Sequence, residues 1–142
     1  MEGIKYIPEK ATIDYVPEFE KEYSKFCKKH NGFEEDMKRF EKALKIEWPK
    51  LLTGTVPISH IGKDFRTCYK AREFRCKSLN RGCRSGIRIV FTFDQDKMNF
   101  LFIELVFKGT DDNHDRDRLM KYALKVNNNQ AAATAGSSVL TE

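Results

Sequence analysis

The stretch SGIRIVFTFDQDKMNFLFIELVFK, residues 85–108, contains two apolar runs separated by a short polar segment. β-branched and aromatic side chains favour extended strands, and a polar segment as short as residues 94–97 joins neighbouring strands as a hairpin. The sequence therefore predicts an antiparallel pair of strands over residues 86–94 and 98–108.

Alternation along these two strands predicts which side chains share a face, because successive residues of a strand point to opposite sides. The face expected to be buried under helices is wholly apolar and comprises Ile87, Ile89, Phe91, Phe93, Leu101, Ile103, Leu105 and Phe107. The opposite face is expected to carry Arg88, Val90, Phe100, Phe102, Glu104, Val106 and Lys108.

The segments before this hairpin predict one strand and two helices. Residues 12–16 are β-branched and alternating, which is typical of a strand, and Pro17 suits the first position of a helix. Apolar residues then recur at helical spacing in two successive sets, Phe19, Tyr23, Phe26 and Phe33, Met37, Phe40, Leu44. Asn31-Gly32 separates the two helices and Trp48-Pro49 closes the second. We expect a helical hairpin whose apolar stripes pack on the sheet.

The remaining ordered segments complete the expected fold. Residues 50–64 contain Gly54, Pro57 and Gly62 and are predicted to form a loop. Residues 65–76 resemble a further strand, and residues 114–125 are predicted to form a short helix capped within residues 111–113.

The fold class predicted from these elements is α+β. It has an N-terminal strand, a helical hairpin on one face of a mainly antiparallel sheet of about four strands, and a short C-terminal helix. Residues 1–11 are an N-terminal extension and residues 12–125 form one domain. Residues 126–142 are small and polar with no pattern that could bury a core, so we expect a flexible tail or a remnant foreign to the protein.

Composition narrows the classes of partner. The formal net charge is +5, which favours a nucleic acid, an anionic membrane or an acidic protein as partner. The sequence contains no apolar run long enough to span a membrane, and its first residues lack the apolar core of a signal peptide. A cytoplasmic location is therefore expected. The four cysteines and three histidines show no metal-ligand spacing. We therefore expect reduced thiols, no metal and no cofactor.

One segment concentrates the positive charge. Between residues 70 and 88 the only acid is Glu73, against seven cations, Lys70, Arg72, Arg75, Lys77, Arg81, Arg84 and Arg88. By alternation Lys70 and Arg72 share an exposed sheet face with Arg88 and Lys108. A solvated exterior explains such a face, and so does a site for a polyanion, because arginine binds phosphate bidentately. Phe100 and Phe102 beside them either stack on bases or are buried by another segment.

The order of these elements and motifs resembles the RelE/ParE toxin superfamily, in particular the RelE-like toxins of toxin–antitoxin modules. The matching pieces are Tyr69-Lys70-Ala71-Arg72, Ser85-Gly86-Ile87-Arg88-Ile89-Val90-Phe91, Ile103-Glu104-Leu105-Val106-Phe107-Lys108 and the opening Ile13-Asp14-Tyr15-Val16-Pro17-Glu18-Phe19. The resemblance covers residues 12–124.

The resemblance implies a metal-independent endoribonuclease that cleaves mRNA in the decoding site of the ribosome and is neutralised by an antitoxin protein. Lys70 and Arg72 would orient the mRNA and aid proton transfer, while Arg88 and Lys108 would clamp the scissile phosphate. Relatives commonly add a tyrosine or histidine near the C-terminus, for which His114 is the nearest candidate after Lys108, with Tyr122 further along the chain. The basic connection that holds Arg75, Lys77, Arg81 and Arg84 would contact ribosomal RNA.

Two alternatives stay open at this point. ParE-like relatives share the fold and poison gyrase, and in that case Lys70, Arg72 and Arg88 are surface charge. The chain could also be a non-catalytic RNA-binding or ribosome-binding relative that keeps the cations without a competent acid–base group. In every version an antitoxin segment is expected to cover an apolar edge or groove.

Overall fold

A computed structural model describes residues 5–58, 62–72, 74, 86–107 and 115–125. In these residues the elements are a 3-10 helix η1 (Pro8–Lys10), β1 (Thr12–Tyr15), α1 (Pro17–Lys29), α2 (Phe33–Glu47), β2 (Thr55–Ile58), β3 (Cys68–Ala71), β4 (Ile87–Asp94), β5 (Asn99–Phe107) and α3 (Arg116–Ala123). The strands form one sheet in the order β1-β5-β4-β3-β2. The pair β1–β5 is parallel and the other pairs are antiparallel, which confirms the predicted α+β class.

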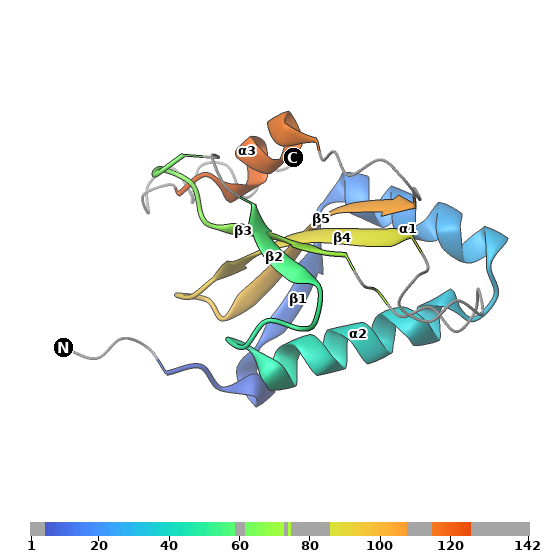
Figure 1. The fold of residues 1–142 in the computed structure, drawn as a ribbon, viewed down its shortest axis with the longest axis horizontal. Coiled ribbons are helices and arrows are strands. Elements are labelled where there is room, and N and C mark those ends of the chain that lie inside the picture. The colour runs from blue at the N-terminus through green and yellow to red at the C-terminus, as the bar shows by residue number, and fades with distance from the viewer. Residues whose placement is uncertain (1–4, 59–61, 73, 75–85, 108–114, 126–142) are drawn as a thin grey trace.

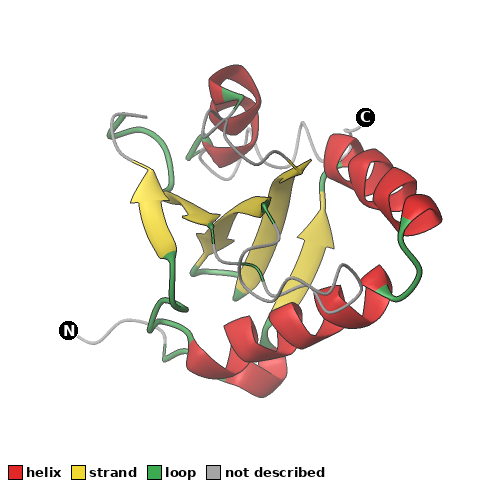
Figure 2. Cartoon of the chain, turned by 45° about the vertical axis from the view of Figure 1, so that its right-hand side comes forward, coloured by secondary structure: helices red, strands yellow, loops and turns green. Residues whose placement is uncertain are grey.

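The helices lie where the helical spacing predicts them. Figures 1 and 2 show α2 and α3 on opposite sides of the sheet, with α1 beside the end of β5. Gly32 adopts a left-handed φ of 90° between α1 and α2, a conformation that favours glycine and reverses the chain there. At α3 the capping residue is Asp115, whose carboxylate accepts the Arg118 backbone N–H at 3.1 Å. The cap predicted within residues 111–113 lies outside the described residues.

The prediction of a loop over residues 50–64 is wrong for β2. Thr55–Ile58 pairs antiparallel with β3, and Val56 lies opposite Lys70. Pro57 makes the segment look unlike a strand, but an edge strand tolerates proline because one row of its backbone groups faces away from the sheet. The sheet therefore has five strands among the described residues, and β3 is an internal strand rather than an edge.

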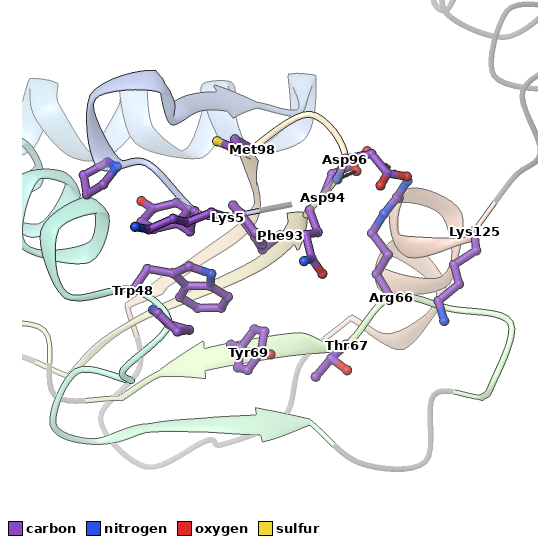
Figure 3. A pocket seen from close by; sticks show the side chains of 14 residues that line it. Lys5, Trp48, Arg66, Thr67, Tyr69, Phe93, Asp94, Asp96, Met98 and Lys125 are labelled. Carbon is purple, nitrogen blue, oxygen red and sulfur yellow. Dashed lines mark hydrogen bonds and ion pairs between the residues drawn. The ribbon is translucent and has the colours of Figure 1, made fainter. Parts of the chain in front are cut away.

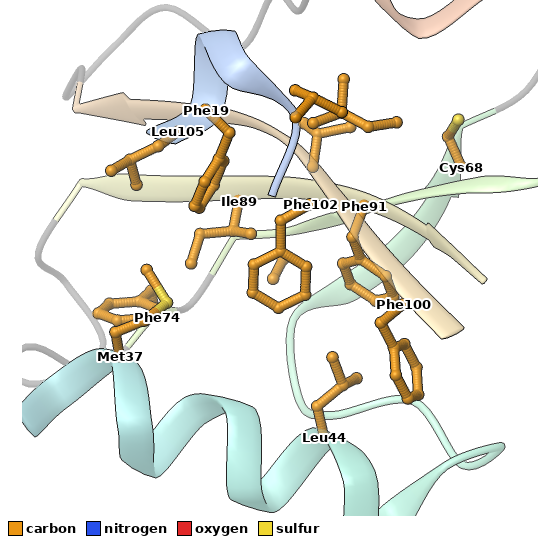
Figure 4. Packing of buried hydrophobic residues seen from close by; sticks show 14 of the residues in the cluster. Phe19, Met37, Leu44, Cys68, Phe74, Ile89, Phe91, Phe100, Phe102 and Leu105 are labelled. Atoms are coloured by element: carbon orange, nitrogen blue, oxygen red, sulfur yellow. The ribbon is translucent and has the colours of Figure 1, made fainter. Parts of the chain in front are cut away.

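The core on the α1–α2 side is built from aromatic rings (Figure 4). Phe102 lies edge-on to Phe19 with ring centroids 5.5 Å apart and to Phe40 at 6.0 Å. Trp48 packs edge-on to Phe100 at 5.2 Å. Phe100 and Phe102 are both 0% exposed. The helical hairpin thus covers this face of the sheet, as predicted.

A register shift changes which β5 residues face the hairpin. Val90 pairs with Glu104, but its neighbour Phe91 pairs with Phe102, so Ile103 is the extra residue of a β-bulge. A one-residue shift moves every later side chain to the other face. Leu105 pairs with Ile89 and lies on the hairpin face as predicted, and the bulge lets Phe102 share that face with it.

Two predictions for β5 are corrected by this bulge. Phe100 and Phe102, expected on the open face, lie on the hairpin side because they pair with Phe93 and Phe91. Leu101, expected in the hairpin core, pairs with Thr92 and lies on the face that α3 partly covers.

Beyond the end of β1, two side chains form hydrogen bonds with the backbone of β5. The Leu105 N–H donates to the Glu22 carboxylate at 3.1 Å, and the Arg118 guanidinium donates to the Ile103 carbonyl at 2.9 Å. The pair joins α1 to α3 at the bulge. No helix within the described ranges is long and apolar enough to span a bilayer.

Candidate functional site

The structure describes five of the predicted site residues and places three of them together. Lys70, Arg72 and Arg88 lie on the same side of the sheet, whereas Phe100 and Phe102 lie on the other. The remaining predicted residues, Arg75, Lys77, Arg81, Arg84, Lys108 and His114, lie outside the described residues. The set of Lys70, Arg72 and Arg88 is called the cationic face below.

Strand register brings the three cations to the same end of the β3–β4 pair. Lys70 is opposite Val90 and Ala71 is opposite Ile89, and Arg72 and Arg88 lie one residue beyond this last pair on their respective chains. Directly opposed residues of antiparallel strands have Cβ atoms about 5 Å apart, and diagonal neighbours are within reach of long side chains. The cationic face therefore gathers its three residues at one end of two neighbouring strands.

The cationic face is less open than the sequence predicts. Lys70 is only 6% exposed, while Arg88 is half-buried and Arg72 is exposed. Burial of Lys70 follows from β2, because Val56 pairs beside it on the edge that the sequence analysis left unpaired, and a lysine stem packs readily on apolar neighbours. The prediction of an exposed Lys70 is wrong.

Backbone contacts fix the positions of the two arginines. The Arg72 N–H donates to the Gly54 carbonyl at 3.2 Å, which holds the end of β3 against the segment before β2. The Arg88 guanidinium donates to the Gly86 carbonyl at 3.2 Å. Gly86 has a φ of 83°, a left-handed conformation suited to glycine at the start of β4. Arg88 is thus held at the strand end, beside Arg72.

Phe100 and Phe102 do not belong to this site. Both are fully buried among the rings of Trp48, Phe19 and Phe40, so neither presents a face on which a base could stack. Their assignment as RNA-binding residues is wrong, and the bulge in β5 is the physical reason.

Glu104 is an acid that the sequence analysis did not assign to any site. It pairs with Val90, on the same side of the sheet as the cationic face, and is 8% exposed. Its carboxylate accepts the Asp115 N–H at 3.0 Å, and burial raises its pKa although Arg118 opposes the shift. Glu104 therefore anchors α3. A single acid inside an apolar strand was the signal available in the sequence.

The described residues contain no group of three or more His, Cys, Asp and Glu side chains placed to hold a metal ion. The described residues of the cationic face offer guanidinium and ammonium groups, which can bind a phosphate and stabilise negative charge. Searches against protein-family models, curated proteins and solved structures found no match to this chain.

Proposed function

We propose that the chain is a RelE-like toxin that cleaves mRNA on the ribosome, and that the cationic face binds the scissile segment. The observation that carries the proposal is the β3–β4 register, in which Lys70 lies opposite Val90 and both Arg72 and Arg88 follow directly beyond the last pair, Ala71 and Ile89. The order of strand, helical hairpin, antiparallel strands and final helix also agrees with the resemblance noted in the sequence.

The chemistry required of such a site is modest. RNA supplies its own nucleophile, since the 2′-OH can lose its proton to a base and attack the adjacent phosphate while the P–O5′ bond breaks and the 5′-oxygen leaves with a proton. The protein must position the strand, transfer these protons and stabilise the developing negative charge. Arg88, half-buried and held through Gly86, is suited to clamp the phosphate, and exposed Arg72 to orient the strand. In this proposal Lys108 and His114 complete the site, with His114 as the acid–base group. The antitoxin is the expected protein partner.

Substitution of Arg88 tests the proposal. We expect Arg88→Ala to abolish cleavage of ribosome-bound mRNA while the fold is kept, and Arg88→Lys to retain a fraction, because lysine keeps the charge without the bidentate fork. Lys38→Ala is the matched control, since Lys38 is exposed on α2 away from the cationic face. Full activity of a folded Arg88→Ala variant would rule out its role as the phosphate clamp.

One observation favours a second candidate, a non-catalytic RNA-binding protein with the same fold. Lys70 is buried at 6% exposure, so little of its side chain is open to a substrate. Under this alternative Arg72 and Arg88 still bind RNA, but no strand is cut. RNA binding without cleavage by a folded wild-type chain on programmed ribosomes would select it.

A further inference from the structure

A cavity of about 1000 Å³ opens at the end of the sheet remote from the cationic face. It lies where β4 ends and β3 begins, next to the β4–β5 turn (Figure 3). Arg88 stands at the start of β4 and Asp94 at its end, a separation of about 20 Å along an extended strand. The cavity is therefore a separate site from the cationic face.

Aromatic rings form one wall of this cavity. Trp48 stands perpendicular to Tyr69 with ring centroids 5.3 Å apart and lies 5.0 Å from Phe93. Tyr6 closes the wall at 5.7 Å from Phe93, and its hydroxyl donates to the Lys45 carbonyl at 2.7 Å. Trp48 is only 9% exposed, whereas Tyr6, Tyr69 and Phe93 are half-buried, so the ring surface open to the cavity comes mainly from these three. Such rings accept a planar ligand by stacking.

The charged residues at the rim of the cavity carry a net positive charge. Arg66 and Asp94 form an ion pair at 3.1 Å and so balance each other. Lys5 and Lys125 are both exposed at the rim, against Asp96 alone. Burial raises the pKa of Tyr6 and of Tyr69, so both phenols stay neutral and add no negative charge.

We propose that this cavity binds a nucleotide, with the base against the aromatic wall and the phosphate at the rim that carries Lys5 and Lys125. A planar ring matches the wall, and an anionic group matches the rim, whereas a cationic ligand would meet two lysines. The same chemistry fits a free nucleotide and a nucleotide within an RNA strand. The site is independent of the proposed cleavage, because none of the cationic face lines the cavity.

The chain contains a single tryptophan, Trp48, so tryptophan fluorescence reports directly on the cavity. The full chain is titrated with uridine monophosphate, with uridine and with a short oligouridylate. We expect a saturable change in the Trp48 signal with the monophosphate or the oligouridylate, and weaker binding of uridine, which lacks the phosphate.

Matched variants locate the ligand. The double variant Lys5→Ala/Lys125→Ala is expected to weaken binding of the phosphate-bearing ligands by up to about fivefold, the range for one exposed ionic contact, and to leave uridine unchanged. Lys97→Ala is the control, since Lys97 is exposed on the adjoining turn but does not line the cavity. Arg88→Ala should also leave the titration unchanged, whatever its effect on cleavage.

Each result decides the proposal. Saturation by the oligouridylate alone supports it and assigns the cavity to an RNA strand, and equal binding of the monophosphate supports it as a site for free nucleotide. The proposal is overturned by a Trp48 signal that does not saturate with either phosphate-bearing ligand. It is equally overturned if the double variant binds both of them as tightly as the wild type.

Discussion

The guanidinium of Arg118 donates to both carboxylate oxygens of Glu22 at 3.1 Å, and the two side chains together continue the sheet where β1 stops. Arg118 supplies the donor for the Ile103 carbonyl, and Glu22 supplies the acceptor for the Leu105 N–H. A further residue of a parallel β1 would offer the same two groups. These contacts join α1 to α3 at the β-bulge, which determines the side of the sheet to which each β5 side chain points.

Removal of Arg118 should destabilise the fold strongly. Arg118→Ala leaves the Ile103 carbonyl and the Glu22 carboxylate without their donor, and we expect a loss of about 2–4 kcal/mol in the free energy of unfolding. Urea denaturation measures the loss. Lys121→Ala is the control on the same helix, because Lys121 also pairs with α1 at 3.6 Å through Glu18 but is 63% exposed. A change within about 0.5 kcal/mol is expected for it. Equal effects of the two variants would contradict the role given to Arg118.

Truncation of Phe102 tests whether its side chain lies on the side of the sheet that the helical hairpin covers. Because Phe102 is 0% exposed and contacts Phe19 and Phe40, Phe102→Ala should cost about 3–5 kcal/mol of unfolding free energy. Val56→Ala, at an exposed site on β2, should cost under about 1 kcal/mol. A Phe102→Ala variant as stable as Val56→Ala would place Phe102 on the surface, as simple alternation predicts.

Glu104 should make stability depend on pH with a definite sign. Burial raises its pKa in the folded chain, so the folded state binds a proton more tightly than the unfolded state does. Its contribution is therefore fully present below the unfolded pKa and is lost as pH rises through the folded pKa. Glu104→Gln, whose amide oxygen still accepts the Asp115 N–H, lacks this dependence. The stability of the wild type relative to Glu104→Gln should fall from acidic to neutral pH, and a constant or rising difference would contradict the assignment.

Arg72 offers a test of RNA binding that does not depend on cleavage. It is exposed on the cationic face, so Arg72→Ala should weaken binding of single-stranded RNA by removing one phosphate contact. The slope of log affinity against log salt should fall in magnitude by about 0.7, the value for one contact to a single strand. Filter binding at several salt concentrations measures the slope, and Lys38→Ala should leave it unchanged. A slope unaltered by Arg72→Ala would remove Arg72 from the RNA interface.

The helical hairpin and the β4–β5 hairpin were predictable because their signals are local. Helical spacing from Phe19 to Leu44 and the polar turn after Asp94 each specify one conformation. The bulge at Ile103 was not predictable, because residues 99–107 are apolar at almost every position. The pattern of apolar residues is then compatible with either face of β5 pointing to the helical hairpin. The burial of Lys70 was missed for a related reason. It depends on β2, whose proline conceals a strand, and on pairing between segments distant in sequence.

The same distinction applies to the candidate site. Lys70, Arg72 and Arg88 could be assigned to one face because β3 and β4 alternate regularly. The aromatic cavity around Trp48 could not be predicted, since it assembles residues from both ends of the described chain, from Lys5 to Lys125. No local pattern in the sequence connects these residues.

The most direct test of the central claim is primer extension on mRNA incubated with the wild-type chain, with and without programmed ribosomes. The account predicts cuts within the codon in the decoding site, seen only when ribosomes are present and absent with Arg88→Ala. An intact message on ribosomes treated with folded wild-type chain would contradict the account. A DNA supercoiling assay would then test the gyrase alternative.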